Sequence, residues 1–326
     1  MDEPPNCFVR DLRRGGARAV TRFPHPQPQL RAVRKELLRY RRADGVDLTG
    51  TLYWPAAWDS MRDGPLPLLM WAYPQEYASA AAAGQVADSP YRFVRATWSS
   101  PVPWVLLGYA VLDDPSLPII GEGGAEPNDT YVAQLVAGAQ AAVDAVTARG
   151  VADPARLAVG GHSYGAFMTA NLLAHSDLFR AGVARSGAYN RTLTPFGFQA
   201  EERTLWEAAP AYLAMSPFLH ADRIDEPLLL VHGEADNNSG THPLQSERFF
   251  QALQGNGGVA RLVMLPYESH GYRARESVLH VLWETWRWLE THVKGAGPRP
   301  APAGDGSGPP GRGDAGAGAR SGLDVE

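Results

Sequence analysis

Hydrophobic and polar positions follow two alternating patterns between residues 35 and 293. The run Leu66 to Tyr73 (LPLLMWAY) is continuously apolar, which is typical of a strand buried on both faces of a sheet. Between a capping residue, Asn128 or Asp129, and Gly150, apolar side chains recur at spacings of three and four and predict an amphipathic helix. Strand and helix patterns of these kinds then succeed one another along the chain.

This alternation predicts an α/β fold, with a mostly parallel sheet covered by helices on both faces. The predicted strands are Glu36 to Tyr40, Asp47 to Trp54, Leu66 to Tyr73, Tyr109 to Leu112, Arg156 to Val159, Ala181 to Ala184, Pro227 to His232 and Arg261 to Pro266. Later helices are predicted at Tyr164 to about His175, about Pro243 to Leu253, and Glu276 to Val293. The small residues from Ala78 to Ala87 are expected to form a loop.

The two ends of the chain differ from this central part. Phe8 to Leu12 and Ala17 to Phe23 predict a two-stranded hairpin, which alone is marginally stable in water. It is either an extra hairpin on the main domain or the remnant of a larger β-domain. The stretch 295–326 is rich in Gly, Pro and Ala and is expected to be disordered. We therefore divide the chain into residues 1–30, 31–294 and 295–326.

Composition narrows the class of function. The 326 residues carry a net charge of −5, and no basic patch suggests a nucleic-acid partner. No apolar run approaches the roughly 18 residues of a membrane span, and the first residues lack the pattern of a secretory signal, so a soluble, intracellular protein is expected. Cys7 is the only cysteine, which excludes an intramolecular disulfide and a cysteine-based zinc site. No metal or organic cofactor is implied.

The stretch Gly161-His162-Ser163-Tyr164-Gly165 has the G-x-S-x-G pattern of a nucleophile elbow. It stands between a predicted strand and a predicted helix, where the turn would project the serine oxygen beside the helix N-terminus. A glycine-rich turn with an incidental serine gives the same short pattern, but this context favours Ser163 as a nucleophile. The motif therefore predicts the α/β-hydrolase fold.

A serine nucleophile needs a histidine base and an acid that orients the histidine, and in this fold they follow in the order acid, histidine. Asp236 follows the strand that ends at His232 and is the predicted acid, whereas Glu234 lies closer to the strand and is expected to face solvent. His270 follows the last predicted strand and is the predicted base. The adjacent Gly271 would allow a sharp turn there.

Three other histidines are expected to be structural. His162 flanks the serine and is expected to lie behind the reacting groups, His232 ends a strand, and His280 lies within a predicted helix.

The negatively charged oxygen of a tetrahedral intermediate needs preorganised hydrogen-bond donors. Elbow geometry makes the backbone N–H of Tyr164 one of them. Tyr73, at the end of an early strand, is a candidate for the second through its phenol hydroxyl, although a core or rim aromatic would fit there equally well. The sequence has no His-Gly-Gly-Gly stretch at this point, which disfavours a lipase-type oxyanion hole.

Together these motifs resemble the prolyl oligopeptidase family of serine peptidases. The family motifs Gly-x-Ser-Tyr-Gly-Gly, His-Gly-x-x-Asp and a late His-Gly read here as Gly161 to Gly165, His232 to Asp236 and His270-Gly271, with Ala166 in place of the second glycine. The family's oxyanion tyrosine closes an early buried strand, and the resemblance therefore favours Tyr73 for that role.

Within the family, the chain is most similar to glutamyl endopeptidases of plants and bacteria. The stretches that carry this resemblance are Gly160 to Leu173, Ala184 to Phe198 and Glu268 to Tyr272. The resemblance implies cleavage after glutamate, and a location in the chloroplast stroma of a plant or alga or in the cytoplasm of a bacterium. Family members carry a β-propeller before the hydrolase domain, so residues 1–30 are interpreted as the propeller's last strands.

A pocket for a substrate glutamate should be cationic. Arg191 is the first choice as a bidentate partner for that carboxylate, with Arg185 and Arg203 as further candidates. All three could equally be solvated surface arginines. Three aromatic residues from the same region would either wall the pocket or belong to the core: Phe196, Phe198 and Trp206.

The expected function is hydrolysis of peptide substrates by a Ser163–Asp236–His270 triad. Two alternatives stay open at this point: an esterase or acyl hydrolase that uses the same triad, and a non-catalytic truncated fragment.

Overall fold

A computed structural model describes residues 3–85 and 89–297. An eight-stranded sheet in the order β12-β11-β10-β9-β5-β7-β4-β3 forms its centre. The strands are β3 (Arg34–Arg41), β4 (Asp47–Trp54), β5 (Leu66–Trp71), β7 (Ala110–Asp113), β9 (Ala152–His162), β10 (Ala181–Arg185), β11 (Leu228–Gly233) and β12 (Ala260–Leu265). Neighbours from β12 to β7 pair in parallel, whereas β4 pairs antiparallel with both β7 and β3.

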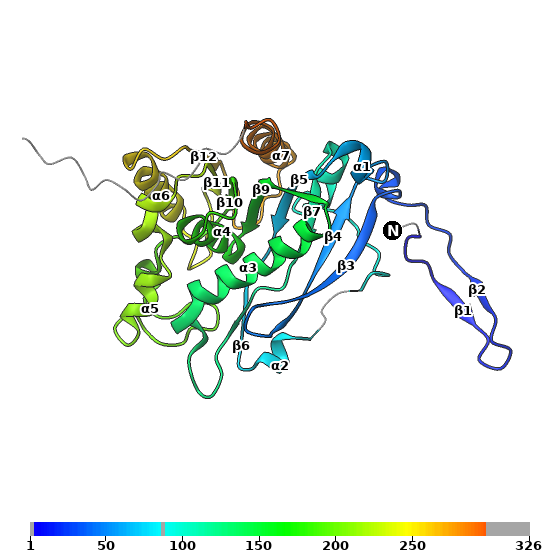
Figure 1. Cartoon of the computed structure of the whole chain (residues 1–326), viewed down its shortest axis with the longest axis horizontal. Helices are drawn as coiled ribbons and strands as arrows, with labels where there is room; N and C mark the ends of the chain where they lie inside the picture. The colour runs from blue at the N-terminus through cyan, green and yellow to red at the C-terminus, as the bar shows by residue number, and fades with distance from the viewer. Residues whose placement is uncertain (1–2, 86–88, 298–326) are drawn as a thin grey trace, which may run out of the picture.

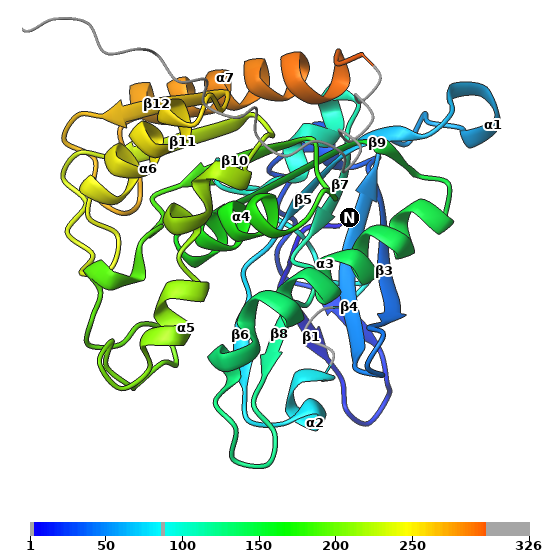
Figure 2. The same ribbon diagram turned by 60° about the vertical axis from the view of Figure 1, so that its left-hand side comes forward.

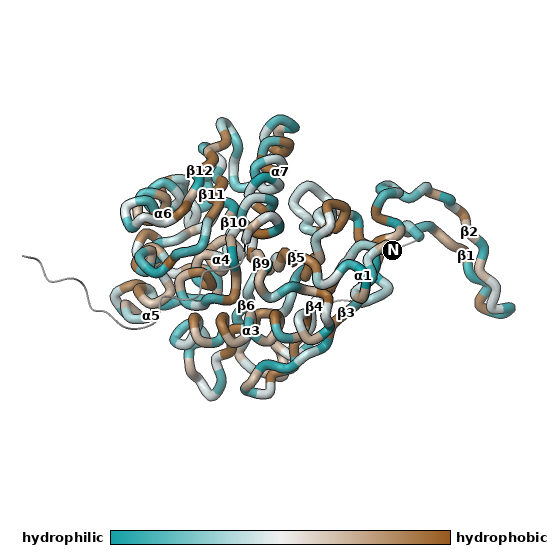
Figure 3. The backbone as a smooth tube through the Cα atoms, turned by 45° about the horizontal axis from the view of Figure 1, so that its top comes forward, coloured by the Kyte–Doolittle hydropathy of each residue, from teal (hydrophilic) through white to brown (hydrophobic). Residues whose placement is uncertain are grey.

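Helices cover both faces of this sheet, as Figures 1 and 2 show. On one face lie α3 (Tyr131–Ala148), α4 (Tyr164–His175) and α6 (Leu244–Gly255), and on the other lies α7 (Arg275–Leu289), which continues into a π-helical turn, Glu290–Lys294. Because side chains alternate along a strand, Leu68 and Met70 of β5 join the first apolar cluster and Leu69 joins the second. Figure 3 shows the hydrophobic positions along the central strands.

Strand order, parallel pairing and two helical layers make this the α/β-hydrolase fold, as the sequence predicted. None of the helices in the described residues is long and apolar enough to cross a membrane.

Several short elements were not predicted. The stretch expected as a loop contains a single helical turn, α2 (Ala80–Ala83), where the Ser79 hydroxyl accepts a hydrogen bond from the Ala82 N–H. A small second sheet pairs β6 (Gln75–Tyr77) in parallel with β8 (Pro118–Ile120). Two further short helices are α1 (Ser60–Asp63) and α5 (Ala209–Ala214). Elements of three to six residues are too short for hydrophobic periodicity to reveal them.

The predicted N-terminal hairpin is present as β1 (Phe8–Arg10) and β2 (Ala17–Ala19), paired antiparallel. It forms a sheet of its own and projects from the molecule near β3 (Figure 1). The hairpin does not join the main sheet, and its side chains are largely exposed. Its origin in a larger β-domain, and the division of the chain at residue 30, stay predictions. Of the predicted disordered stretch, everything beyond residue 297 lies outside the described residues.

Candidate active site

Ser163 lies at the turn between β9 and α4 with φ 60° and ψ −117°. A positive φ is strained for a residue with a side chain, and such strain persists only where the surroundings enforce it. Two glycines permit the tight turn here. A Cβ on Gly161 would lie 2.4 Å from the carbonyl oxygen of Gly165, and a Cβ on Gly165 would lie 2.4 Å from that of Ala72. The turn therefore has the backbone geometry of a nucleophile elbow.

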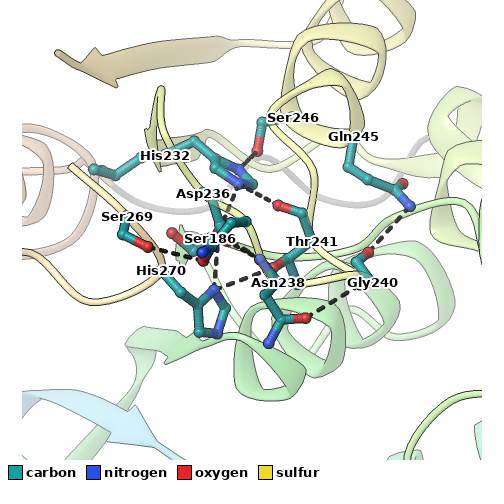
Figure 4. A network of polar contacts seen from close by, with 12 residues as sticks. Ser186, His232, Asp236, Asn238, Gly240, Thr241, Gln245, Ser246, Ser269 and His270 are labelled. Atoms are coloured by element: carbon teal, nitrogen blue, oxygen red, sulfur yellow. Dashed lines mark hydrogen bonds and ion pairs between the residues drawn. The ribbon is translucent and has the colours of Figure 1, made fainter. Parts of the chain in front are cut away.

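Asp236 is buried in the loop that follows β11, and its carboxylate is held from several sides (Figure 4). Oδ1 accepts a hydrogen bond from the Asn238 N–H at 3.0 Å, and Oδ2 accepts one from the Thr241 hydroxyl at 3.2 Å. Burial acts to raise the pKa of Asp236, but hydrogen bonds from His232, His270 and Asn238 hold it well below its usual value. The competing acid, Glu234, is exposed as predicted.

His270 lies beside this carboxylate, with Nδ1 2.8 Å from Asp236 Oδ2 and 3.1 Å from Thr241 Oγ1. Because a carboxylate only accepts, Nδ1 carries the hydrogen and Nε2 is the basic nitrogen of a neutral ring. Within the described residues, Nε2 is not hydrogen-bonded to the Ser163 hydroxyl. The ring of His162, the neighbour of Ser163, lies 4.8 Å from the His270 ring, which brings the elbow and the His270 loop together.

Tight packing of two loops brings Asp236 and His270 together. A Cβ on Gly233 would lie 2.4 Å from the carbonyl oxygens of both Glu268 and Ser269, so the two chains touch where β11 ends. The Ala235 N–H donates to Glu268 O at 2.9 Å. The Glu268 carboxylate in turn accepts the N–H groups of residues 273 and 274 at 2.8 Å, just before α7. The chain bends at His270 and Gly271, as expected, although Gly271 has no positive φ; the residue of this loop with a positive φ is Tyr267, at 62°.

The two tyrosines of the predicted oxyanion hole lie together, with ring centroids 5.7 Å apart. Tyr73 is 40% exposed, and its hydroxyl accepts a hydrogen bond from the Gln199 side chain at 3.3 Å. The Tyr164 side chain is buried and donates to Glu76, whereas its backbone N–H lies in the first turn of α4, where helix N–H groups have no intrahelical partner.

Ser163 lines a pocket of about 380 Å³ that Arg191 also lines. Arg191 is buried, and its guanidinium carbon lies 4.0 Å from the ring centre of Phe167 and 4.1 Å from that of Phe198. Its Nε has no hydrogen-bond partner, and within the described residues no carboxylate lies within ion-pair distance. Burial lowers the pKa of Arg191, but a guanidinium stays charged in a protein.

The other two candidate arginines do not line this pocket and are engaged elsewhere. Arg185 packs over the Trp71 ring at 4.7 Å and donates to the Thr285 hydroxyl at 3.1 Å. Arg203 pairs with Glu201 at 2.8 Å and with Asp129 at 2.9 Å. Arg191 alone among the three is placed to meet a ligand beside Ser163.

The candidate aromatic residues fall into two groups. Phe196 lines the pocket, is exposed and packs against the exposed Trp206 with ring centroids 5.7 Å apart. Phe198 also lines the pocket and covers the Arg191 guanidinium. The sequence left open whether these aromatics were wall or core, and only the contact of Phe198 with Arg191 gives one of them a clear electrostatic role.

Three contacts of the site were not foreseen from the sequence. Thr241 bonds to both Asp236 and His270, Gln199 bonds to Tyr73, and His232 lies against Asp236. For His232 a signal existed, since it stands four residues before Asp236 in the same motif. The other two contacts come from loops without periodicity, where sequence patterns carry no distance information.

Comparison with known proteins places the chain among relatives of one family. The profile of the prolyl oligopeptidase family matches residues 131–296. The chain is 61% identical over 274 residues to a probable chloroplastic glutamyl endopeptidase of Oryza sativa subsp. japonica, a match that covers 84% of this chain and 29% of the relative. The Arabidopsis thaliana protein of the same description is also 61% identical, with 28% of it covered. This chain thus spans less than a third of their length.

Solved structures agree on the fold. A puromycin-hydrolyzing peptidase of Mycobacterium tuberculosis superposes with a TM-score of 0.65 at 23% identity, over 90% of this chain and 44% of that one. A dipeptidyl peptidase 4 of Porphyromonas gingivalis gives a TM-score of 0.68 at 21% identity, over 89% and 40%. With the fold, the elbow at Ser163 and the matched profile in agreement, this chain belongs to the prolyl oligopeptidase family.

Proposed function

We propose that this domain is a serine peptidase that cleaves peptide bonds on the C-terminal side of glutamate. The observation that carries the proposal is Arg191, a buried guanidinium in the pocket that Ser163 lines, which has no ion-pair partner in the part of the chain that the structure describes. A buried charge is costly unless it is paired. A substrate carboxylate entering this pocket would supply the missing partner through charge-assisted, bidentate hydrogen bonds.

The reaction is acyl transfer to water. His270 Nε2 takes the proton of the Ser163 hydroxyl as its oxygen attacks the substrate carbonyl carbon, and Asp236 stabilises the imidazolium that forms. The Tyr73 hydroxyl and the Tyr164 N–H donate to the oxygen that becomes negative. The intermediate then collapses, the C–N bond breaks, and His270 gives its proton to the departing amine. Water, activated by the same histidine, finally releases the acyl group from Ser163.

The pocket suits a glutamate side chain. The rings of Phe167 and Phe198 pack against the Arg191 guanidinium carbon and fix the position of its planar fork. Glu76 is the acid whose charge acts on Arg191, but its carboxylate accepts a hydrogen bond from the Tyr164 hydroxyl, and among the described residues the two side chains form no ion pair. The Arg191 guanidinium can therefore pair with a substrate carboxylate.

A set of fluorogenic peptides that differ only in the residue before the cut tests this proposal. We expect kcat/KM for Glu to exceed that for Gln by about 100-fold, because Gln lacks the charge that pairs with Arg191. A fluorophosphonate probe should label Ser163. Hydrolysis of short esters without cleavage after Glu would favour an esterase, and absence of labelling in folded protein would favour a non-catalytic fragment.

The plant relatives are described as chloroplastic. We propose the same compartment for this protein where its source is a plant or alga. A fluorescent fusion of the complete coding sequence tests this, since signal outside the plastids contradicts it.

A further inference from the structure

A second serine–histidine pair lies behind the acid of the proposed triad (Figure 4). His232, at the end of β11, is completely buried. Its Nδ1 lies 2.6 Å from the Ser246 hydroxyl, and its Nε2 lies 2.6 Å from the Thr241 carbonyl oxygen and 3.1 Å from Asp236 Oδ2. Ser246, His232, Asp236 and His270 thus form one continuous hydrogen-bonded chain that leads toward the elbow.

The partners of His232 determine where its proton lies. A backbone carbonyl and a carboxylate can only accept hydrogen bonds, so Nε2 must carry hydrogen and donate to Thr241 O and Asp236. In the neutral ring, Nδ1 then accepts a hydrogen bond from the Ser246 hydroxyl. The two acceptors at Nε2 therefore fix the tautomer, and Ser246 at Nδ1 helps to fix the orientation of the imidazole.

The hydrogen bond from His232 Nε2 completes the set of contacts that hold the Asp236 carboxylate. Oδ2 lies between two imidazoles, His232 on one side and His270 on the other, as Figure 4 shows. The terminal torsion of an aspartate is broad and roughly two-fold when nothing restrains it. Here the Asn238 N–H on Oδ1 and the donors on Oδ2 leave one orientation.

Hydrogen bonds also connect this network to the proposed substrate pocket. Ser246 lies in the first turn of α6, beside Gln245. The Gln245 side chain accepts the N–H groups of Tyr189 and Asn190 at 3.0 and 2.9 Å and donates to Asn190 O at 3.1 Å. Asn190 directly precedes Arg191, so the first turn of α6 connects the acid's support with the pocket that holds the unpaired guanidinium.

We propose that His232, oriented by Ser246, is a positioning residue of the reaction. It holds the Asp236 carboxylate in the one orientation from which it can align His270 for proton transfer. This inference rests on the proposed function, because it assumes that His270 serves Ser163 as its base. It predicts a loss in the chemical step with little change in substrate binding.

Two variants of the complete protein separate positioning from general structural support. In His232→Gln the amide nitrogen occupies about the place of Nε2 and can still donate to Asp236, whereas in His232→Asn the shorter side chain cannot. A misplacement of about 1 Å in a catalytic group costs about 100-fold in rate. We expect His232→Asn to lower kcat on a Glu peptide about 100-fold, with KM within about threefold of wild type, and His232→Gln to recover to within about tenfold.

His280→Asn serves as the matched control, because His280 is half exposed on α7, where it pairs with Glu284 and does not belong to the network. It is expected to retain the wild-type kcat. Equal losses in His232→Asn and His232→Gln, or a kcat of wild-type size in folded His232→Asn, would overturn the inference. If His232→Asn does not fold, Ser246→Ala replaces it, since it removes one hydroxyl only. A kcat loss of about tenfold at unchanged KM supports the inference, and an unchanged kcat overturns it.

Fluorophosphonate labelling of the wild-type protein keeps the two proposals distinguishable. A wild type that is not labelled at Ser163 refutes the proposed function itself. A labelled wild type together with equal labelling rates in the folded His232 variants refutes only the role of His232.

Discussion

At the scale of single residues, the site is defined by how a few buried polar groups are paired. Asp236 is fully paired, with every oxygen held by donors, and it is buried as an anion. Arg191 is the opposite case, a buried cation whose Nε has no hydrogen-bond partner among residues 3–85 and 89–297. A buried polar group with all its partners holds its neighbours in one arrangement. A buried charged group that lacks a partner marks a place where a ligand of opposite charge can bind.

Replacing Arg191 by methionine should lower the activity on Glu peptides without lowering the free energy of unfolding. Methionine keeps an apolar stem between Phe167 and Phe198 but removes the charge, and replacing a buried charge by an apolar side chain is often stabilising by about 1 kcal/mol or more. We expect kcat/KM for a Glu peptide to fall about 100-fold while hydrolysis of a small neutral ester is unchanged. Denaturant unfolding should show an equal or higher free energy of unfolding.

Arg248→Met is the control for this substitution, because Arg248 is exposed on α6, where its side chain donates a hydrogen bond to Gln251. Equal losses of kcat/KM on Glu and Gln peptides in Arg191→Met would remove Arg191 from the pocket.

The free energy of unfolding should decline in mild acid because of two partly buried histidines. Burial, together with the nearby His220 and Arg223, lowers the pKa of His175 to about 4, and burial with His270 and Arg185 does the same for His162. Between pH 6.5 and 4 the unfolded chain binds protons that the folded chain does not, so the free energy of unfolding falls as pH falls through this window. His175→Gln, away from the site, should flatten that decline in denaturant unfolding curves measured from pH 7 to 4. Curves parallel to wild type would contradict the assignment.

At the scale of elements, the site depends on where strands end. β5, β9, β11 and β12 deliver Tyr73, Ser163, Asp236 and His270 to the same edge of the sheet, because parallel strands share their carboxyl ends. Glycines then allow the loops to touch. The close approach at Gly233, where β11 ends, brings the Asp236 and His270 loops together.

Gly233→Ala should therefore reduce both stability and rate. Its Cβ would lie 2.4 Å from two backbone carbonyl oxygens, which cannot move like a flexible side chain. We expect a loss of about 1–3 kcal/mol in the free energy of unfolding and about 100-fold in kcat. Gly255→Ala is the matched control, because a Cβ there meets nothing within 4 Å. A Gly233→Ala variant with wild-type kcat would show that the loops adjust freely.

The elements also show how far the sequence could predict the structure. The strand, turn and helix around Ser163 follow from local patterns, and so does the order of Asp236 and His270 along the chain. The contacts of Thr241 and Gln199 could not be foreseen, since they join loops whose distance in space depends on the whole sheet. The same reason hid the pairing of β6 with β8, two strands of three residues each.

At the scale of the whole molecule, the site is wider than the segment that matches the family profile. Tyr73 follows β5, outside residues 131–296, and packs against Tyr164 inside them. The sheet is one continuous structure across this boundary, and the proposed oxyanion hole takes one tyrosine from each side of it. The β1–β2 hairpin, by contrast, contributes no residue to the apolar clusters, whose first member along the described chain is Leu30.

Removal of the hairpin should therefore leave the fold intact. Among its described residues, the stretch 1–23 contains exposed apolar side chains such as Phe8 and Val9 and no member of the apolar clusters, so a variant that lacks it should match the full chain in its free energy of unfolding. A variant that lacks residues 1–33 also loses Leu30 and Val33, both buried in the cluster beside α7. Each buried aliphatic side chain contributes about 1.5–3 kcal/mol, so the second truncation should cost roughly 3 kcal/mol or more. Urea unfolding of the two variants checks this, and an equal loss in both would show that the hairpin supports the domain through contacts of its own.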